Sequence, residues 1–136
     1  MPWNDFVISD DKEKIQLERV CQLLGATYWE KGRPREVVEK SIANSMCFGI
    51  YLQNTQVGFA RCVTDYATVY WLADVVVDSD YRHLGLGKAL VEAIAAHKQL
   101  RTCFGILATQ DAHRLYERYG FRLVKDRFMR KPAEQE

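Results

Sequence analysis

Apolar residues recur at helical spacing in four segments of the chain. The first covers residues 15–24, the second begins at Pro34, the third covers 86–94 and the fourth covers 112–119. Side chains three or four positions apart share one helix face, so each segment presents an apolar stripe to a core. Asp111 stands where a capping side chain would precede the fourth helix.

Runs rich in β-branched, aromatic and apolar residues predict strands between these helices. The run 68–77 is almost wholly apolar, as expected for a strand buried on both faces, and Asp74 is its one charge. The predicted strands, in chain order, are 6–8, 48–52, 57–63, 68–77 and 104–108, followed by a hairpin of 121–124 and 127–130. Strands in series followed by a strand–helix–strand unit predict a mixed sheet in an α/β (α+β) domain.

Length and composition narrow the class of protein. A chain of 136 residues with 48% hydrophobic and 12% aromatic residues predicts a single globular domain, 1–136. The net charge of +1 gives no basic excess of the kind that nucleic-acid-binding proteins carry. The sequence contains no apolar run of about 18 residues, and residues 1–10 do not resemble a signal peptide. We therefore expect a cytoplasmic protein with neither a membrane nor a nucleic acid as partner.

The four cysteines form no Cys-x-x-Cys pair, and the histidines stand at no ligand spacing from them. Cysteines among apolar neighbours are typical of small buried hydrophobes in a reducing compartment. A zinc site or a catalytic cysteine is the alternative, and no metal is expected.

A glycine-rich turn joins the strand 68–77 to the helix 86–94. Gly85 and Gly87 allow backbone N–H groups to point into one concavity, and the helix adds the positive end of its dipole. Arg82 and Lys88 stand at the rim of this turn and can add positive charge. The turn therefore predicts a site for a phosphate or pyrophosphate, with a plain connecting turn as the alternative.

Two nucleotide motifs do not fit this turn. A P-loop needs glycine where Arg82 stands and Ser or Thr where Ala89 stands. A dinucleotide fingerprint needs a third glycine where Leu90 stands. The remaining pattern is Arg-x-x-Gly-x-Gly after a valine-rich strand end.

Two segments resemble the GNAT superfamily of acyl-CoA-dependent N-acyltransferases. Residues 82–87 are similar to the family pattern R/Q-x-x-G-x-G/A, and residues 112–121 are similar to A-x-x-L-Y-x-x-x-G-F. Both stand in the family's order and separation, one on each side of a short strand. The resemblance implies a GNAT-type mixed, largely antiparallel twisted sheet of six to seven strands flanked by about four helices.

The resemblance also implies acetyl-CoA as the acyl donor. Strands 68–77 and 102–108 would separate near Val77, and pantetheine would pair with the backbone around Val75 and Val77. Thr109 replaces a frequent asparagine, which leaves its contact with the donor in doubt. The implied donor-binding residues are Val75, Val77, Arg82, His83, Leu84, Gly85, Leu86, Gly87, Lys88, Thr109, Ala112 and Tyr116.

The implied reaction is attack of an amine on a thioester. Tyr116 is the expected general acid for the leaving thiolate, and a backbone N–H near Val77 would polarise the carbonyl. Trp71 stands where some relatives have a glutamate base. Asp74 is therefore the candidate base, acting through water, unless a structural partner such as Arg61 fixes it; water alone is the third option.

The acceptor is expected to be the amine of a small molecule or a peptide. Tyr28, Trp29 and Arg33, with Tyr66 and Trp71 as further candidates, would line its site or else cap the core. A non-catalytic acyl-CoA-binding module and a phosphate-binding interaction domain are the alternative functions, and a homodimer is one option for the assembly.

Overall fold

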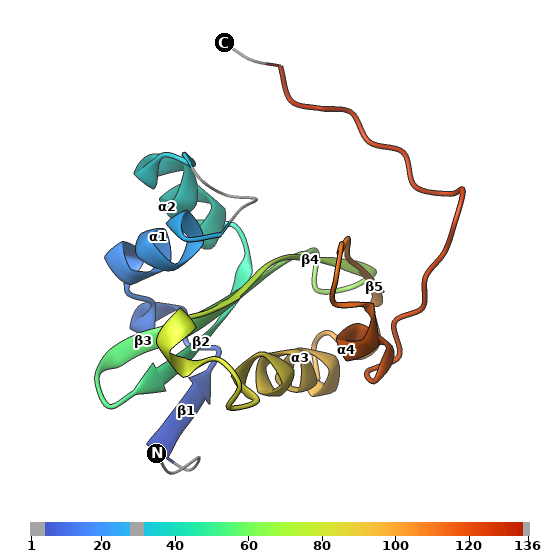
Figure 1. The fold of residues 1–136 in the computed structure, drawn as a ribbon. Coiled ribbons are helices and arrows are strands. Elements are labelled where there is room, and N and C mark those ends of the chain that lie inside the picture. Colours follow the sequence, from blue (N-terminus) through green and yellow to red (C-terminus); the bar gives the residue numbers. More distant parts are fainter. Residues whose placement is uncertain (1–4, 28–31, 135–136) are drawn as a thin grey trace.

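The computed structural model describes residues 5–27 and 32–134. Its helices and strands follow one another as the sequence predicts as far as the fourth helix (Figure 1). In chain order they are β1 (Phe6–Ser9), η2 (Lys12–Lys14), α1 (Leu17–Gly25), α2 (Arg35–Ala43), β2 (Met46–Leu52), β3 (Thr55–Thr64), β4 (Val69–Val77), η3 (Ser79–Tyr81), α3 (Leu86–Ala96), β5 (Phe104–Ile106) and α4 (His113–Glu117).

The strands form one mixed sheet in the order β1-β2-β3-β4-β5. The first four are antiparallel neighbours, and β5 pairs with β4 in parallel. The described residues thus hold five strands, and the expectation of six to seven was wrong. The missing two are the predicted hairpin 121–124 and 127–130, which is not formed. Strand propensity alone does not produce a strand, because the backbone needs a partner edge to pair with.

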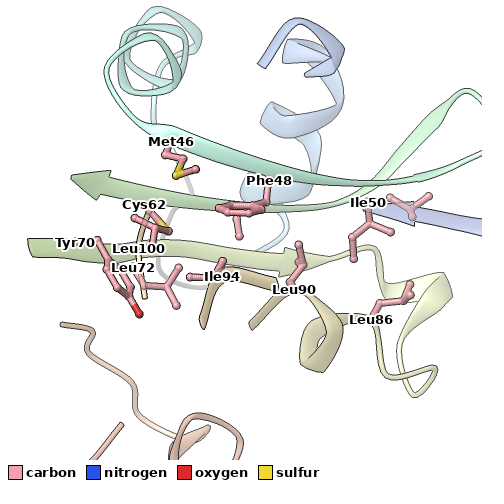
Figure 2. Packing of buried hydrophobic residues seen from close by; sticks show 12 residues of the cluster. Met46, Phe48, Ile50, Cys62, Tyr70, Leu72, Leu86, Leu90, Ile94 and Leu100 are labelled. Atoms are coloured by element: carbon pink, nitrogen blue, oxygen red, sulfur yellow. The ribbon is translucent and has the colours of Figure 1, made fainter. Parts of the chain in front are cut away.

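Helices cover both faces of the sheet. Figure 1 shows α1 and α2 on one face and α3 with α4 on the other. Leu86, Leu90 and Ile94 of α3 pack against a cluster that includes Phe48 and Leu72 of the sheet (Figure 2). A second cluster joins α1 and α2 to the opposite face. Burial of each such side chain contributes about 1.5–3 kcal/mol, so these two clusters hold the layers together.

The fourth helix is shorter than predicted, and no side chain caps it. Asp111 does not cap it, and the Thr109 hydroxyl accepts at 3.0 Å from the N–H of Ala112, the N-cap residue. Thr109 lies three positions before Ala112, a spacing at which a short hydroxyl side chain can reach a backbone N–H. At the other end Gly120 has a φ of 93°, and the Phe121 N–H donates to the Tyr116 carbonyl at 3.2 Å. This left-handed glycine closes the helix.

A β-bulge changes the face that β4 presents. Arg61 of β3 is opposite Asp74, whereas Cys62 is opposite Leu72, so Ala73 is an extra residue in β4. Leu72 therefore packs in the cluster with α3, while Val76 packs with α1 and α2. The bulge thus turns Asp74 towards the α1–α2 side of the sheet.

The four cysteines are free thiols; Cys47 and Cys62 are buried as expected, whereas Cys21 and Cys103 are only partly buried. Burial raises the pKa of Cys47 to about 11 and that of Cys62 to about 12, which makes both thiols inert. Residues 5–27 and 32–134 contain no cluster of side chains that could hold a metal ion. In the same part of the chain no helix has the length and the apolar character to cross a bilayer.

Candidate active site

Strand β4 has an open backbone edge over its second half. Its pairing with β5 covers Val69 to Trp71, with Ile106 as the last partner, although β4 continues to Val77. The two strands therefore separate earlier than expected, because β5 ends at Ile106. The unpaired edge can accept an extended ligand that pairs with it as an added strand would.

The end of β4 is held firmly in place. The Asp78 N–H donates to the Val57 carbonyl at 2.8 Å, and the Asp78 carboxylate accepts from the Asp80 N–H and from Arg19 at 2.8 Å. The hydrogen bond from Asp80, assisted by Arg19, lowers the pKa of Asp78. This carboxylate stays ionised at neutral pH and anchors the start of the turn.

The turn itself contains two residues in the left-handed region. His83 has a φ of 69° and Gly85 a φ of 81°, and Gly85 is the N-cap of α3. Glycine adopts this conformation without a steric penalty, whereas a residue with a Cβ, such as His83, loses about 1–2 kcal/mol. Left-handed residues next to right-handed ones turn successive N–H groups towards one concavity, which is the geometry of an anion nest.

The first turn of α3 has backbone donors with no acceptor in the described chain. The first bond into the helix runs from the Ala89 N–H to the Gly85 carbonyl at 3.0 Å, which leaves the N–H groups of Leu86, Gly87 and Lys88. No side chain caps the helix, and no acidic residue stands in its first turn. These donors and the helix dipole together favour an anionic ligand.

The residues of this turn can contact a ligand either through the backbone or through the side chain. Leu86 is 2% exposed and belongs to the core, so only its N–H can reach a ligand. A Cβ at Gly87 would meet nothing within 4 Å, so packing does not require glycine there, whereas the close approach of a ligand would. Arg82 and Lys88 are exposed and free of ion pairs within the described chain. His83 and Leu84 are also exposed.

Tyr116 lies on α4, half-buried against the α3 cluster. Its ring makes an edge-to-face contact with Phe121, with centroids 5.9 Å apart. Burial, followed by the nearby Asp111 charge, raises its pKa, so the phenol keeps its proton at neutral pH. Its hydroxyl has no hydrogen-bond partner among the described residues. Thr109 is different, because its hydroxyl already accepts from Ala112.

Asp74 is buried between two arginines. Its Oδ2 accepts from Arg61 Nε at 2.8 Å and from Arg33 Nη1 at 3.2 Å, while its Oδ1 is buried with no hydrogen-bond partner. Arg61 also donates to the Ser45 hydroxyl at 3.1 Å. Of the alternatives for Asp74, the structure shows the contact with Arg61. The structure also brings Arg33, expected to line the acceptor site, onto the carboxylate expected to be the base.

Of the remaining acceptor candidates, Tyr66 and Trp71 lie within the described residues. Tyr28 and Trp29 lie outside the described residues. Tyr66 is half-exposed in the turn before β4, with a φ of 61°. Trp71 lies along β4 and its ring stacks on Phe128, with centroids 6.1 Å apart and planes at 7°.

Sequence reasoning missed two contributors. Phe128 stood within a predicted hairpin strand, where nothing marked it as a partner of Trp71. Arg19, which fixes Asp78, is separated from it by 59 positions. No local pattern reveals a pair at that separation.

Comparison with known proteins gives the family. Residues 43–123 match the model of the acetyltransferase (GNAT) domain. The chain is 30% identical to the uncharacterized N-acetyltransferase ycf52 of Pyropia yezoensis, over 91% of this chain and 73% of that protein. It is 36% identical to a crystal structure from Xanthomonas campestris pv. campestris assigned to the GNAT acetyltransferases, with a TM-score of 0.89 over 98% of this chain and 95% of that one.

A more distant structure agrees in fold alone. The protein SA2161 of Staphylococcus aureus is 21% identical, with a TM-score of 0.78 over 96% of this chain and 99% of that one.

By the family model and the two nearer relatives, the chain belongs to the GNAT acetyltransferase family, and it is an acyltransferase. Members of this family take the acetyl group from acetyl-CoA.

Proposed function

We propose that this protein transfers the acetyl group of acetyl-CoA to the primary amine of a small molecule or a peptide. The observation that carries the proposal is the first turn of α3. Its N–H groups at Leu86, Gly87 and Lys88 lack an acceptor in the described chain, and residues 78–85 connect this turn to β4 and its open edge. The free N–H groups suit a pyrophosphate, and the open edge of β4 suits the amide-containing pantetheine arm.

The donor would lie along both features. Backbone N–H groups of the turn from His83 to Lys88 hold the pyrophosphate, and Arg82 adds charge at its rim. Pantetheine pairs with β4 around Val75 and Val77. Ala112 and Thr109 border the donor near its thioester end, and the Thr109 hydroxyl accepts from the Ala112 N–H just before α4.

The reaction needs few protein groups. The amine nitrogen attacks the thioester carbon, and an N–H on the open edge of β4 stabilises the oxygen that becomes negative. The carbon–sulfur bond then breaks, and the thiolate takes the proton of the Tyr116 hydroxyl, which solvent restores. The ammonium formed by attack loses its extra proton to water. The raised pKa of Tyr116 keeps this acid protonated at neutral pH.

We assign Asp74 a positioning role in place of the base. Its Oδ2 is occupied by two guanidinium groups and its side chain is 1% exposed, so an amine in solvent has no direct path to it. The pair with Arg33 ties residues 32–34, just before α2, to β4. Arg33 therefore shapes the acceptor side through Asp74, and proton removal is left to water.

Binding and turnover test this proposal in two steps. Acetyl-CoA at about 100 times its dissociation constant should raise the unfolding free energy by about 2.7 kcal/mol, and inorganic phosphate at the same concentration should not. Release of free thiol is then followed with a panel of amines and amino-terminal peptides.

Each outcome separates one function from another. Stabilisation by acetyl-CoA together with amine-dependent thiol release supports the transferase. Stabilisation without release by any amine would favour the non-catalytic acyl-CoA-binding module. Equal stabilisation by phosphate would favour a general phosphate-binding domain.

A further inference from the structure

Arg19 of α1 joins three separate parts of the fold through one guanidinium group. Its Nε donates to the Gln56 carbonyl at 2.9 Å, its Nη2 to Asp78 Oδ2 at 2.8 Å and its Nη1 to the Gln22 side chain at 3.0 Å. Gln56 belongs to β3, and Asp78 directly follows β4. Each of the three nitrogens therefore donates to an acceptor of the chain, and the side chain is only 26% exposed.

The helix that carries Arg19 is itself fixed to β3. The Gln16 N–H donates to Gln56 Oε1 at 2.9 Å, and the Gln56 N–H donates to Gln16 Oε1 at 3.0 Å. Gln16 is the N-cap residue of α1, and Gln56 is fully buried. These reciprocal bonds hold the first turn of α1 against the sheet, so Arg19 extends from a backbone in a fixed position.

Asp78 connects Arg19 to the turn that leads to α3. Its Oδ2 accepts from Arg19, while its Oδ1 accepts from the Asp80 N–H at 2.9 Å. The Asp78 carbonyl also accepts from the Tyr81 N–H at 2.9 Å. One carboxylate thus bridges α1 and the start of the turn, and both of its oxygens are in use.

The middle of the turn has almost no hydrogen bonds of its own. Residues 82–84 make none with the rest of the described chain, and Gly85 accepts one, from Ala89. His83 and Gly85 are nevertheless held in the left-handed region. Such a segment keeps its shape only if both of its ends are fixed. The buried Leu86 fixes the end at α3, and Asp78 fixes the other end.

We propose that Arg19 is a positioning residue for the acyl donor: it holds Asp78, and with it residues 79–88, in the shape that presents free N–H groups to a pyrophosphate. This role rests on the proposed function, since it takes the pyrophosphate of acetyl-CoA as the ligand of the turn. Hydrogen bonds weaken steeply with distance and angle, so a small shift of these N–H groups lowers affinity. The thioester reacts at the opposite end of the donor, and its chemistry should change little.

The competing explanation is that Arg19 acts only through its positive charge near an anionic ligand. The two explanations predict opposite signs at Asp78. Asp78→Asn removes a negative charge beside the turn, so electrostatics alone predicts tighter binding of acetyl-CoA. A positioning role predicts weaker binding, because an asparagine cannot offer acceptor oxygens to both Arg19 and the Asp80 N–H.

Calorimetric titration with acetyl-CoA and steady-state kinetics of the whole chain test the proposal. Arg19→Gln breaks the contact with Asp78. The matched control, Arg35→Gln, breaks an exposed ion pair with Glu18 of the same helix and changes the net charge equally. We expect Arg19→Gln to raise the Kd and the KM for acetyl-CoA about tenfold or more, with kcat within about threefold of the wild type. Arg35→Gln should leave all three constants unchanged, and Asp78→Asn should weaken binding about threefold or more.

Arg19→Lys separates position from charge. It keeps the positive charge but has one nitrogen in place of three, so it cannot bridge Gln56 and Asp78 as the guanidinium does. We expect it to show most of the loss in affinity of Arg19→Gln. Because it is the milder change, it also provides the measurement if Arg19→Gln does not fold.

Hydrogen exchange without ligand gives a readout that does not depend on acetyl-CoA. The amides of Asp80 and Tyr81 are hydrogen-bonded to Asp78, and they should exchange about tenfold faster or more in Arg19→Lys and Arg19→Gln. Amides of β2 should exchange as in the wild type. Unchanged exchange at Asp80 and Tyr81 would overturn the proposal, because Arg19 would then not hold the turn.

The remaining outcomes separate this role from the proposed function. Wild-type affinity in both Arg19 variants, equal losses in Arg19→Gln and Arg35→Gln, or tighter binding by Asp78→Asn would overturn the positioning role and leave the transferase intact. A wild-type protein that does not bind acetyl-CoA at all would overturn the proposed function, and the donor role of Arg19 with it.

Discussion

Arg61 donates from Nε to the Oδ2 of Asp74 at 2.8 Å, across the bulge where β4 changes face. The carboxylate is 1% exposed, and Arg33 shares the same oxygen at 3.2 Å. Because charged side chains contact Asp74 from both sides, the main effect of this arrangement is to fix the geometry of the strand pair. It ties β3 and the segment before α2 to β4, beside the edge where the thioester would lie.

Replacing this carboxylate should cost stability more than catalysis. Asp74→Asn leaves two partly buried guanidinium groups without their counter-ion, and breaking a buried ion pair typically costs about 3–5 kcal/mol. We expect urea unfolding to show a loss of this size. Turnover measured well below the thermal midpoint should stay within threefold, with an unchanged pH profile.

The double variant Arg61→Gln/Asp74→Asn is the control. If the two residues act as one pair, their losses should be less than additive, by about 1–3 kcal/mol. A stable Asp74→Asn protein whose turnover falls a hundredfold, with the loss of one limb of its pH profile, would instead make Asp74 the base.

A negative charge in the first turn of α3 should separate binding from folding. Gly87→Asp places a carboxylate among the free N–H groups, where a Cβ meets nothing within 4 Å. Replacing a helical glycine contributes about 0.5–1 kcal/mol, and an acid at a helix start about 0.3–1 kcal/mol. The thermal midpoint should hold or rise, while the affinity for acetyl-CoA falls at least tenfold.

The matched control for this prediction is Gln99→Glu, an exposed site beyond the other end of α3. It changes the net charge equally and should leave the affinity intact. Calorimetric titration with acetyl-CoA measures both variants. Wild-type affinity in Gly87→Asp would remove the pyrophosphate from this turn.

Tyr116→Phe should remove the acid without disturbing the fold. The ring keeps its contact with Phe121, and the hydroxyl has no partner to lose among the described residues. We expect stability within about 0.5 kcal/mol and kcat lower by about 100- to 10,000-fold. Binding of acetyl-CoA should change less than threefold.

A second tyrosine serves as the comparison for Tyr116. Tyr119→Phe alters the next turn, where the hydroxyl donates to Glu92 at 3.2 Å outside the proposed donor site. It should retain full turnover in the thiol-release assay. The raised pKa of Tyr116 also means that wild-type turnover should show no falling limb from this group below about pH 10. Full activity of Tyr116→Phe would exclude it as the acid.

The features that the sequence predicted correctly are local ones. The helices follow from apolar spacing, and the turn into α3 follows from its two glycines, of which Gly85 has a φ of 81°. The contacts of Arg33 and Asp74 could not be foreseen, since 41 positions separate them. The bulge at Ala73 also leaves no mark, because an inserted alanine looks like any other strand residue.

The C-terminal segment shows a different limit. The pattern of residues 121–130 predicts two strands with a turn between them, and the structure forms neither strand. Whether such segments pair depends on an edge being within reach, which is a property of the assembled chain or of two chains. Sequence periodicity reports which face of a strand would be buried, and it contains no information on whether a neighbouring strand is in place.

Removing one buried hydroxyl should stabilise the protein and alter its response to alkali. Tyr51 lies across Gly49 of the same strand, and its hydroxyl is buried with no hydrogen-bond partner. An unsatisfied buried polar group costs about 1–3 kcal/mol, so Tyr51→Phe should raise the unfolding free energy by about 1 kcal/mol at neutral pH.

The pH dependence of that difference is the sharper measurement. Burial raises the pKa of Tyr51 to about 12, whereas an unfolded tyrosine ionises near pH 10. Above about pH 10 the unfolded state loses the proton first, so the wild-type protein loses stability as pH rises towards 12, and Tyr51→Phe lacks this contribution. Urea unfolding at about pH 7, 9 and 11 should therefore show a gap between the two proteins that widens only in alkali. Tyr66→Phe, at a half-exposed tyrosine, is the control and should track the wild type throughout. A constant gap across the series would mean that Tyr51 does not titrate differently in the folded state.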